Sequence, residues 1–154
     1  KPKEVCMSFG PGAQFIAERG FGRLISKQEA REILDRSEEA GLIHCSSNTT
    51  DYIDFICNCC DCHCGIVKSL KEQMRNFGSA SNFTVEVDAD GCTGCELCLD
   101  RCPMDALIMK DAVAERIDER CVGCGLCVSS CDAEALRMVN RPFALENWNP
   151  ILAS

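Results

Sequence analysis

The residues in this sequence that could do chemistry are above all its cysteines, which number 15 among 154 residues. Eight of them form two copies of the spacing C-x2-C-x2-C-x3-C. The first copy consists of Cys92, Cys95, Cys98 and Cys102, followed by Pro103, and the second of Cys121, Cys124, Cys127 and Cys131, followed by Asp132. Each cysteine of the second copy lies the same number of residues after its counterpart in the first copy. A repeat this regular indicates one supersecondary unit used twice.

This spacing suits a [4Fe-4S] cluster, which takes one thiolate on each of its four irons. Three thiolates two residues apart can come from one tight loop, and Gly94, Gly123 and Gly125 would let the backbone approach the cluster. In such runs the fourth cysteine ligates the other cluster. We therefore expect one cluster on Cys92, Cys95, Cys98 and Cys131, and a second on Cys121, Cys124, Cys127 and Cys102.

Zinc sites or disulfides are the alternatives for these eight residues. Zinc usually takes two C-x2-C pairs separated by a longer spacer. Disulfides between cysteines two residues apart are strained, and an odd number of cysteines cannot form a closed intramolecular set. The sequence therefore favours clusters. Because proline is not a ligand, Asp132 in its place should not prevent cluster binding. The local turn at Asp132 could differ from that at Pro103.

The segments around the two copies predict the elements that would position them. Residues 83–87 alternate apolar and polar side chains, as a half-buried strand does. Residues 106–109 and 113–117 predict a hairpin around 110–112, and 135–139 predict a closing strand. Short helices should fit at 95–100 and 124–129.

From about Phe83 to Asn140 the chain resembles a bacterial-type two-cluster ferredoxin. The resemblance implies an α+β, ferredoxin-like fold with two pseudo-symmetric halves packed on the clusters. It also implies electron transfer at low potential, exchanged with redox partner proteins or with subunits of an oxidoreductase. We expect this two-[4Fe-4S] domain over residues 81–140 and a C-terminal tail over 141–154.

Residues 1–80 predict a separate, mainly helical, Cys-rich domain. Ser26 and Glu29 form a capping box, and the helix behind it should bury Ala30, Ile33 and Leu34 before it stops at Gly41. A second helix is expected over 65–76, with Ile66, Val67, Leu70, Met74 and Phe77 on one face. A shorter helix should follow the Gly10-Pro11-Gly12 turn, over 12–18.

Between these helices lies a second group of thiols. Cys57, Cys59, Cys60, Cys62 and Cys64 fall within nine residues together with His63, and Cys6 and Cys45 stand apart. We expect a compact loop around a metal. The favoured hypothesis is a third [4Fe-4S] cluster on some of these five thiols together with Cys6. Zinc with His63 or His44 as a nitrogen ligand, and redox-active or disulfide-paired thiols, stay open as alternatives.

A second resemblance covers nearly the whole chain. Residues 41–44, 47–49 and 56–60, together with 4–10, look like a family of longer iron-sulfur proteins from anaerobic bacteria. Those proteins carry a Cys-rich run just before a C-terminal two-cluster domain, and the resemblance implies electron transfer beside a redox enzyme. In them the position of His63 is commonly Cys, and further cysteines lie upstream. We therefore expect this chain to be a fragment or a shortened relative.

Composition and charge exclude several classes of function. The net charge of −8 argues against a nucleic-acid partner. No apolar run is long enough for a membrane span, and the first residues do not form a signal peptide, so a cytoplasmic location is expected. No nucleophile–base pair or nucleotide fingerprint is present. An electron carrier or subunit is therefore favoured over a redox enzyme or a redox or metal sensor acting at the N-terminal cysteines.

Overall fold

The computed structural model describes residues 1–47, 51–72 and 81–141. The chain divides into two units, Lys1–Val67 and Lys68–Ser154. Their boundary falls inside helix α3 (Gly65–Lys71). Both helices and small sheets are present, in agreement with an α+β class. Apart from Arg141, the expected C-terminal tail lies outside the described residues.

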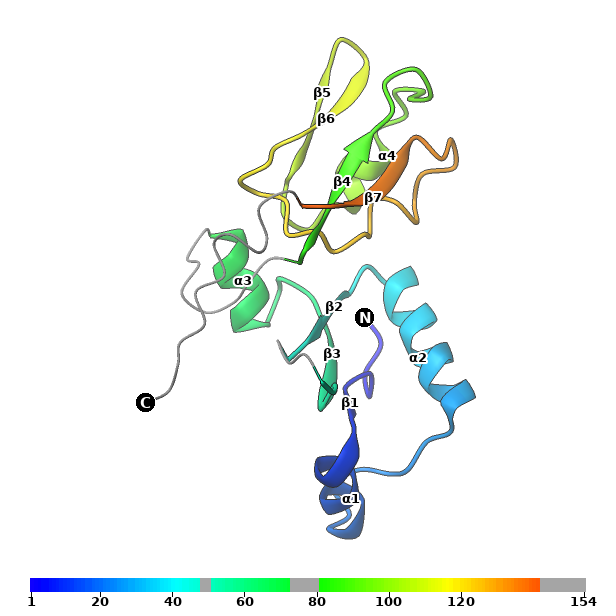
Figure 1. The fold of residues 1–154 in the computed structure, drawn as a ribbon, viewed down its shortest axis with the longest axis vertical. Coiled ribbons are helices and arrows are strands. Elements are labelled where there is room, and N and C mark those ends of the chain that lie inside the picture. The colour runs from blue at the N-terminus through cyan, green and yellow to red at the C-terminus, as the bar shows by residue number, and fades with distance from the viewer. Residues whose placement is uncertain (48–50, 73–80, 142–154) are drawn as a thin grey trace. The chain divides into compact units, whose positions relative to one another are not determined.

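The N-terminal unit is built on a three-stranded antiparallel sheet of order β1-β3-β2 (Figure 1). The strands are β1 (Met7–Ser8), β2 (Ile43–Ser46) and β3 (Phe55–Cys59). Helices α1 (Gly10–Glu18) and α2 (Lys27–Glu39) lie between β1 and β2 in the chain. A mainly helical domain was expected, so the sheet is a difference. Its strands are short, and β1 pairs with a strand far along the chain, Met7 with Ile56, which local patterns do not reveal.

Helix α2 forms as the sequence predicts. The Ser26 hydroxyl accepts a hydrogen bond from the Glu29 backbone N–H at 3.1 Å, which satisfies one of the unpaired donors of the first turn. At the other end, Gly41 N–H donates to Glu38 and Leu42 N–H to Ser37, and Gly41 has a φ of 73°. This is a Schellman motif. It turns Leu42 back into the core.

The other two helices differ from expectation in their limits. Helix α1 begins at Gly10 rather than Gly12, because Pro11 occupies its first turn, where a missing N–H costs nothing. Helix α3 begins at Gly65 as predicted and ends at Lys71. Met74 and Phe77, expected on its apolar face, lie outside the described residues. Val67 is fully buried, but Ile66 is 49% exposed, so its placement on the buried face was wrong.

The C-terminal unit contains two antiparallel strand pairs. Strand β4 (Phe83–Val87) pairs with β7 (Leu136–Asn140), and β5 (Leu107–Lys110) pairs with β6 (Val113–Arg116). The β5–β6 hairpin was predicted. Its two turn residues, Asp111 and Ala112, both have positive φ, which is the geometry of a type I′ turn and matches the twist of the strands.

The two copies of the repeat exchange their strands. Strand β4, which precedes the first four cysteines, pairs with β7, which follows the second four. Conversely, β6 precedes the second four and pairs with β5, which follows the first four. The copies are not identical: α4 (Leu97–Arg101) forms in the first copy, whereas residues 126–130 of the second form turns and not the expected helix.

Each unit has its own apolar core among the described residues. In the N-terminal unit Val5, Met7, Ile33 and Leu42 pack together, with Ala30 and Leu34 against them. In the C-terminal unit the buried set consists of Val85, Cys98, Leu107, Ala114, Cys127 and Leu136. Two of these buried residues are cysteines of the repeat, so the core and the candidate ligands share the same volume.

Candidate functional site

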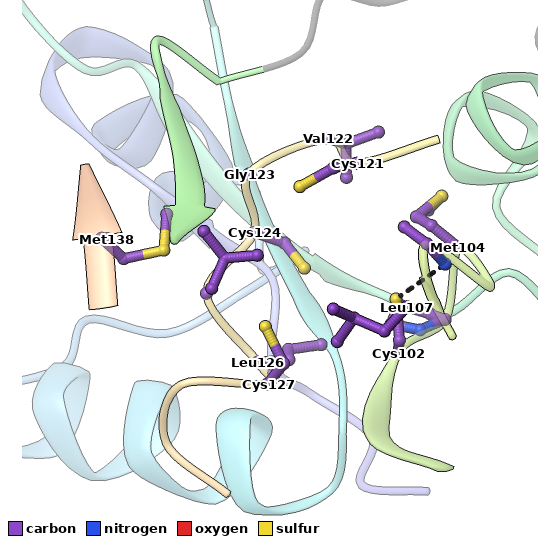
Figure 2. A pocket seen from close by; sticks show the side chains of 14 residues that line it. Cys102, Met104, Leu107, Cys121, Val122, Gly123, Cys124, Leu126, Cys127 and Met138 are labelled. Carbon is purple, nitrogen blue, oxygen red and sulfur yellow. Dashed lines mark hydrogen bonds between the residues drawn. The ribbon is translucent and has the colours of Figure 1, made fainter. Parts of the chain in front are cut away.

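A first cavity in the C-terminal unit is lined by Cys102, Cys121, Cys124 and Cys127. Figure 2 shows the four sulfurs turned toward one shared space, with Leu107, Leu126 and Met138 around them. No charged side chain is among the described residues that line it. Three of the four thiols therefore come from the second copy of the repeat and one from the first.

A second cavity has the complementary composition. Its cysteines are Cys92, Cys95, Cys98 and Cys131, three from the first copy and one from the second, and Met109, Ala114 and Leu136 complete much of its wall. Each cavity is thus lined by three cysteines of one copy and one of the other.

Two equivalent glycines allow the loops to close on these cavities. Gly123 has a φ of 70°, and a Cβ there would overlap the Phe83 carbonyl oxygen. Gly94 has a φ of 69°, and a Cβ would lie 2.7 Å from the Ala112 carbonyl oxygen. Ala112 stands in the second copy where Phe83 stands in the first. Each loop therefore approaches a backbone carbonyl at the same place, and only glycine fits there.

Hydrogen bonds reach sulfur atoms of both sets. The Ala106 backbone N–H donates to Cys102 Sγ at 3.3 Å, and that of Ala114 to Cys92 Sγ at 3.5 Å. The hydroxyl of Thr84, a residue only 4% exposed, donates to Cys121 Sγ at 3.6 Å. Donors of this kind stabilise negative charge on a thiolate and on a cluster bound to it, and they tune reduction potential.

Three of these thiols, those of Cys98, Cys124 and Cys127, resist ionisation when no metal compensates their charge. Burial, together with the neighbouring Cys124, Cys102 and Cys121, raises the pKa of the Cys127 thiol to about 12. Burial is also the largest cause of the raised pKa of Cys124 and of Cys98, and neighbouring thiols of the same set add to it. Metal binding displaces these protons and supplies positive charge. Four convergent sulfurs in an apolar wall fit a [4Fe-4S] cluster by the chemistry of the donor set.

The N-terminal cysteines are divided between two faces of the sheet. Cys57 and Cys59 lie two residues apart on β3, and Cys45 on β2 is directly opposite Cys57, so these three share one face. Cys57 also has side-chain hydrogen bonds with Cys59 and Cys6, and Cys59 has one with Cys64. The first part of the Cys-rich run is therefore strand, and the expected compact loop was wrong for it.

Cys60 and Cys62, expected among the metal ligands, are instead joined to each other in a disulfide with a Cα–Cα distance of 5.3 Å. Cys60 packs against the core of Val5, Met7, Ile33 and Leu42, on the face opposite Cys57 and Cys59. Within the described part of the chain, no three Cys, His, Asp or Glu side chains converge on the position of a single metal ion.

Cys45 is the residue that sequence reasoning left out of the candidate site. Its place beside Cys57 depends on the pairing of β2 with β3, and neither strand was predicted. The apolar Leu42 and Ile43 before it were the only signal. His44 lies on the other face, where its Nδ1 is hydrogen-bonded to Asn58 Oδ1, and His63 is exposed in the turn after Cys62.

Comparison with known proteins gives one finding for the repeated region. A family model described as a 4Fe-4S dicluster domain matches residues 84–132. No curated protein matches the sequence. Across the described residues, no helix has both the length and the apolar character needed to span a membrane. The matched region is thus an iron-sulfur domain of ferredoxin type, and such domains bind [4Fe-4S] clusters and exchange electrons with redox partners.

Proposed function

We propose that residues 81–140 form a bacterial-type, ferredoxin-like electron-transfer domain that carries two [4Fe-4S] clusters with crossed ligation. One cluster is assigned to Cys92, Cys95, Cys98 and Cys131, and the other to Cys121, Cys124, Cys127 and Cys102. The observation that carries the proposal is the lining of the two cavities, each with three cysteines from one copy of the repeat and one from the other.

The packing of the thiols supports electron exchange between two such sites. Cysteines of both sets pack against one shared core around Val85, Leu107 and Leu136, so the two cavities are close neighbours. When bound, each cluster supplies a one-electron centre whose potential depends on its surroundings. The apolar wall lowers the local dielectric, and the hydrogen bonds to Cys92, Cys102 and Cys121 offset part of the charge.

The surface charge of this region supports a basic docking patch on the partner. Residues 83–140 contain twelve Asp and Glu and five Lys and Arg. A strongly acidic surface steers association with a partner of opposite potential, at rates that fall as salt screens the charges. We assign the protein to the role of carrier or subunit beside an oxidoreductase of an anaerobic, cytoplasmic system.

We further propose that the N-terminal unit carries a third metal centre. Support comes from its thiols, because five cysteines of this unit, Cys6, Cys45, Cys57, Cys59 and Cys64, lie close to one another. In this role the centre would extend the electron path of the ferredoxin-like domain.

Crossed ligation is tested by three serine variants of the full chain, purified and reduced with dithionite without oxygen. Cys95→Ser marks the cluster of the first copy and Cys124→Ser that of the second. Cys102→Ser lies in the first copy by sequence, but in the second cavity. We expect its EPR spectrum to match that of Cys124→Ser, because both remove a ligand of the same cluster.

The same EPR spectra include outcomes that would contradict the proposal. A Cys102→Ser spectrum that matches Cys95→Ser would show that each copy binds its own cluster. Native protein with far fewer than eight irons per chain, or without the paired signals of two coupled reduced clusters, would end the two-cluster assignment itself.

A further inference from the structure

Strand register brings the N-terminal thiols onto one face of a sheet. Cys45 pairs with Cys57, and Ile43 pairs with Cys59, across β2 and β3. Met7 pairs with Ile56, so Cys6, one residue earlier in the chain, comes opposite Cys57. Side chains two residues apart on a strand, or directly opposite across a pair, point the same way. We call Cys6, Cys45, Cys57, Cys59 and Cys64 the thiol face.

A tight turn carries the last of these residues back to the sheet. The Cys64 N–H donates to the Cys60 carbonyl at 3.3 Å, which closes the turn between β3 and α3. Cys64 thereby reaches both Cys59 and Cys57. Cys45 also acts on Cys59 electrostatically. Cys45, Cys57, Cys59 and Cys64 are half-buried, whereas Cys6 is exposed.

The opposite face of the same sheet has a structural role. Ile56 and Cys60 pack against the apolar core that α2 covers. The Asn58 side chain donates to the Val5 carbonyl and contacts His44. Cys60 is thus directed to that core, and Cys62 is its disulfide partner. His44 is therefore directed away from the thiol face, and the donors that face presents are sulfurs.

A set made of thiolates selects soft metals, namely zinc, copper(I) or iron-sulfur clusters. We propose that the thiol face holds a [4Fe-4S] cluster with Cys45, Cys57, Cys59 and Cys64 as its four ligands, with Cys6 at its exposed edge and the Cys60–Cys62 pair outside the site. This rests on the proposed third centre and gives it a defined ligand set. The assembly process that would load clusters into the C-terminal unit would also act on the N-terminal unit of the same chain.

The decisive comparison is between Cys45→Ser and Cys62→Ser in the full chain. Both remove one cysteine of the N-terminal unit, but only Cys45 lies on the thiol face. After anaerobic reconstitution with iron and sulfide, we expect about twelve irons per chain in the native protein and in Cys62→Ser. Cys45→Ser should lose about one third of the iron, with zinc content unchanged and the coupled EPR signals of the other clusters retained.

Two further variants separate the ligands from their neighbours. Cys59→Ser should repeat the loss seen with Cys45→Ser, and Cys6→Ser should keep the native iron content. Iron lost in Cys62→Ser but kept in Cys45→Ser would overturn the assigned ligand set. Zinc in the native protein at one atom per chain would overturn the iron-sulfur assignment. If the native protein instead lacks the coupled signals, the two-cluster proposal fails, and the iron lost between native protein and Cys45→Ser still tests this site.

Discussion

The two thiol-rich regions of this molecule stand in opposite relations to their cores. In the C-terminal unit Cys98 and Cys127 are among the buried residues that pack with Val85, Leu107 and Leu136. In the N-terminal unit the buried core is aliphatic, around Val5, Met7, Ile33 and Leu42. The thiol face lies on the other side of the sheet from that core. One region is built around its candidate ligands, and the other carries them on an independent scaffold.

This difference bears on how metal binding is coupled to folding. A site whose ligands form the core cannot keep its packing when the metal leaves, because the cavity empties and its thiols repel or require protonation. A site on the outer face of a sheet leaves the helix-to-sheet packing in place. We therefore expect the fold of the C-terminal unit to depend on bound metal, and the fold of the N-terminal unit to persist without it.

Removal of iron is the largest perturbation that tests this contrast. We expect a chelator with an oxidant, followed by a thiol reductant, to abolish the amide hydrogen-exchange protection of β4 and β7. Exchange there should accelerate by several orders of magnitude, since metal affinity is folding free energy in such a domain. The amides of α2 should keep most of their protection. Mass spectrometry of peptides from the full chain measures hydrogen exchange in both regions in one experiment.

The opposite pattern would break the comparison. If β4 and β7 keep their protection without iron, the apolar residues around the cavities suffice to hold the unit. Loss of protection in α2 would show that the thiol face supports the N-terminal core after all. Replacement of Ile33 by Ala gives a reference for α2, because truncation of a buried Ile costs about 2–5 kcal/mol in this unit alone.

Gly123→Ala should be the most damaging single substitution that touches no candidate ligand. A Cβ at this position overlaps the Phe83 carbonyl, which belongs to β4, and the residue has a φ of 70°. The left-handed conformation alone costs about 1–3 kcal/mol for a residue with a side chain, and the overlap adds to that. We expect a lower midpoint of thermal cluster loss, followed by visible absorbance.

Substitutions of two other glycines should lower the midpoint by less. Gly94→Ala should follow closely, because its Cβ would meet the Ala112 carbonyl at 2.7 Å. Gly65→Ala should leave the midpoint within about 1 °C, since nothing lies within 4 Å of its Cβ position and its φ is not positive. Equal effects of all three substitutions would show that close approach of the loops is not what holds the cavities.

The repeat explains why so much of the C-terminal unit could be predicted from sequence. Four cysteines at fixed spacing, used twice, determine which loop surrounds which cavity, and alternating residues at 83–87 predicted β4 with its observed limits. The hairpin turn at Asp111 and Ala112 lay between two apolar runs. Local patterns and the repeat pointed to the same structure there. The errors included one-residue shifts of strand ends and the expected helix at 124–129, where residues 126–130 form turns.

The N-terminal unit was less predictable, because its candidate site depends on pairing between distant segments. Cys45 joins the thiol face only through the register of β2 on β3, and a run of cysteines has no hydrophobic period to indicate a strand. The capping residues Ser26 and Gly41 predicted α2 because both act within one turn of the helix. Short-range chemistry was predictable, and long-range register was not.

The substitution Thr84→Val tests a difference between the two cavities of the C-terminal unit. The cavity lined by Cys121 receives a hydroxyl hydrogen bond, from Thr84 to Cys121 Sγ. The position equivalent to Thr84 in the second copy is Val113, which cannot donate. A donor stabilises the more negative, reduced state, so its removal should lower the potential of one cluster. One hydrogen bond corresponds to about 20–60 mV for a single electron, measurable by voltammetry or EPR titration.

Thr84→Ser is the matched control, because it keeps the hydroxyl and should keep the potential near the native value. A drop in the potentials of both clusters by the same amount would contradict the assignment, since a specific bond to Cys121 acts on one cluster. An unchanged pair of potentials in Thr84→Val would show that the 3.6 Å contact contributes nothing to redox tuning.

The smallest expected effect concerns the residue after the fourth cysteine, Pro103 in the first copy and Asp132 in the second. The turn does not differ between the copies: Asp105 N–H donates to Cys102, Glu134 N–H donates to Cys131, and both donor residues have φ near 50°. Asp132→Pro should therefore fit the same turn and stabilise the unit by about 0.4–1 kcal/mol, through lower entropy of the unfolded chain. Thermal unfolding of the iron-loaded protein would show a small rise. A large loss of iron would instead mean that the backbone N–H of Asp132, which proline lacks, is needed by the second copy.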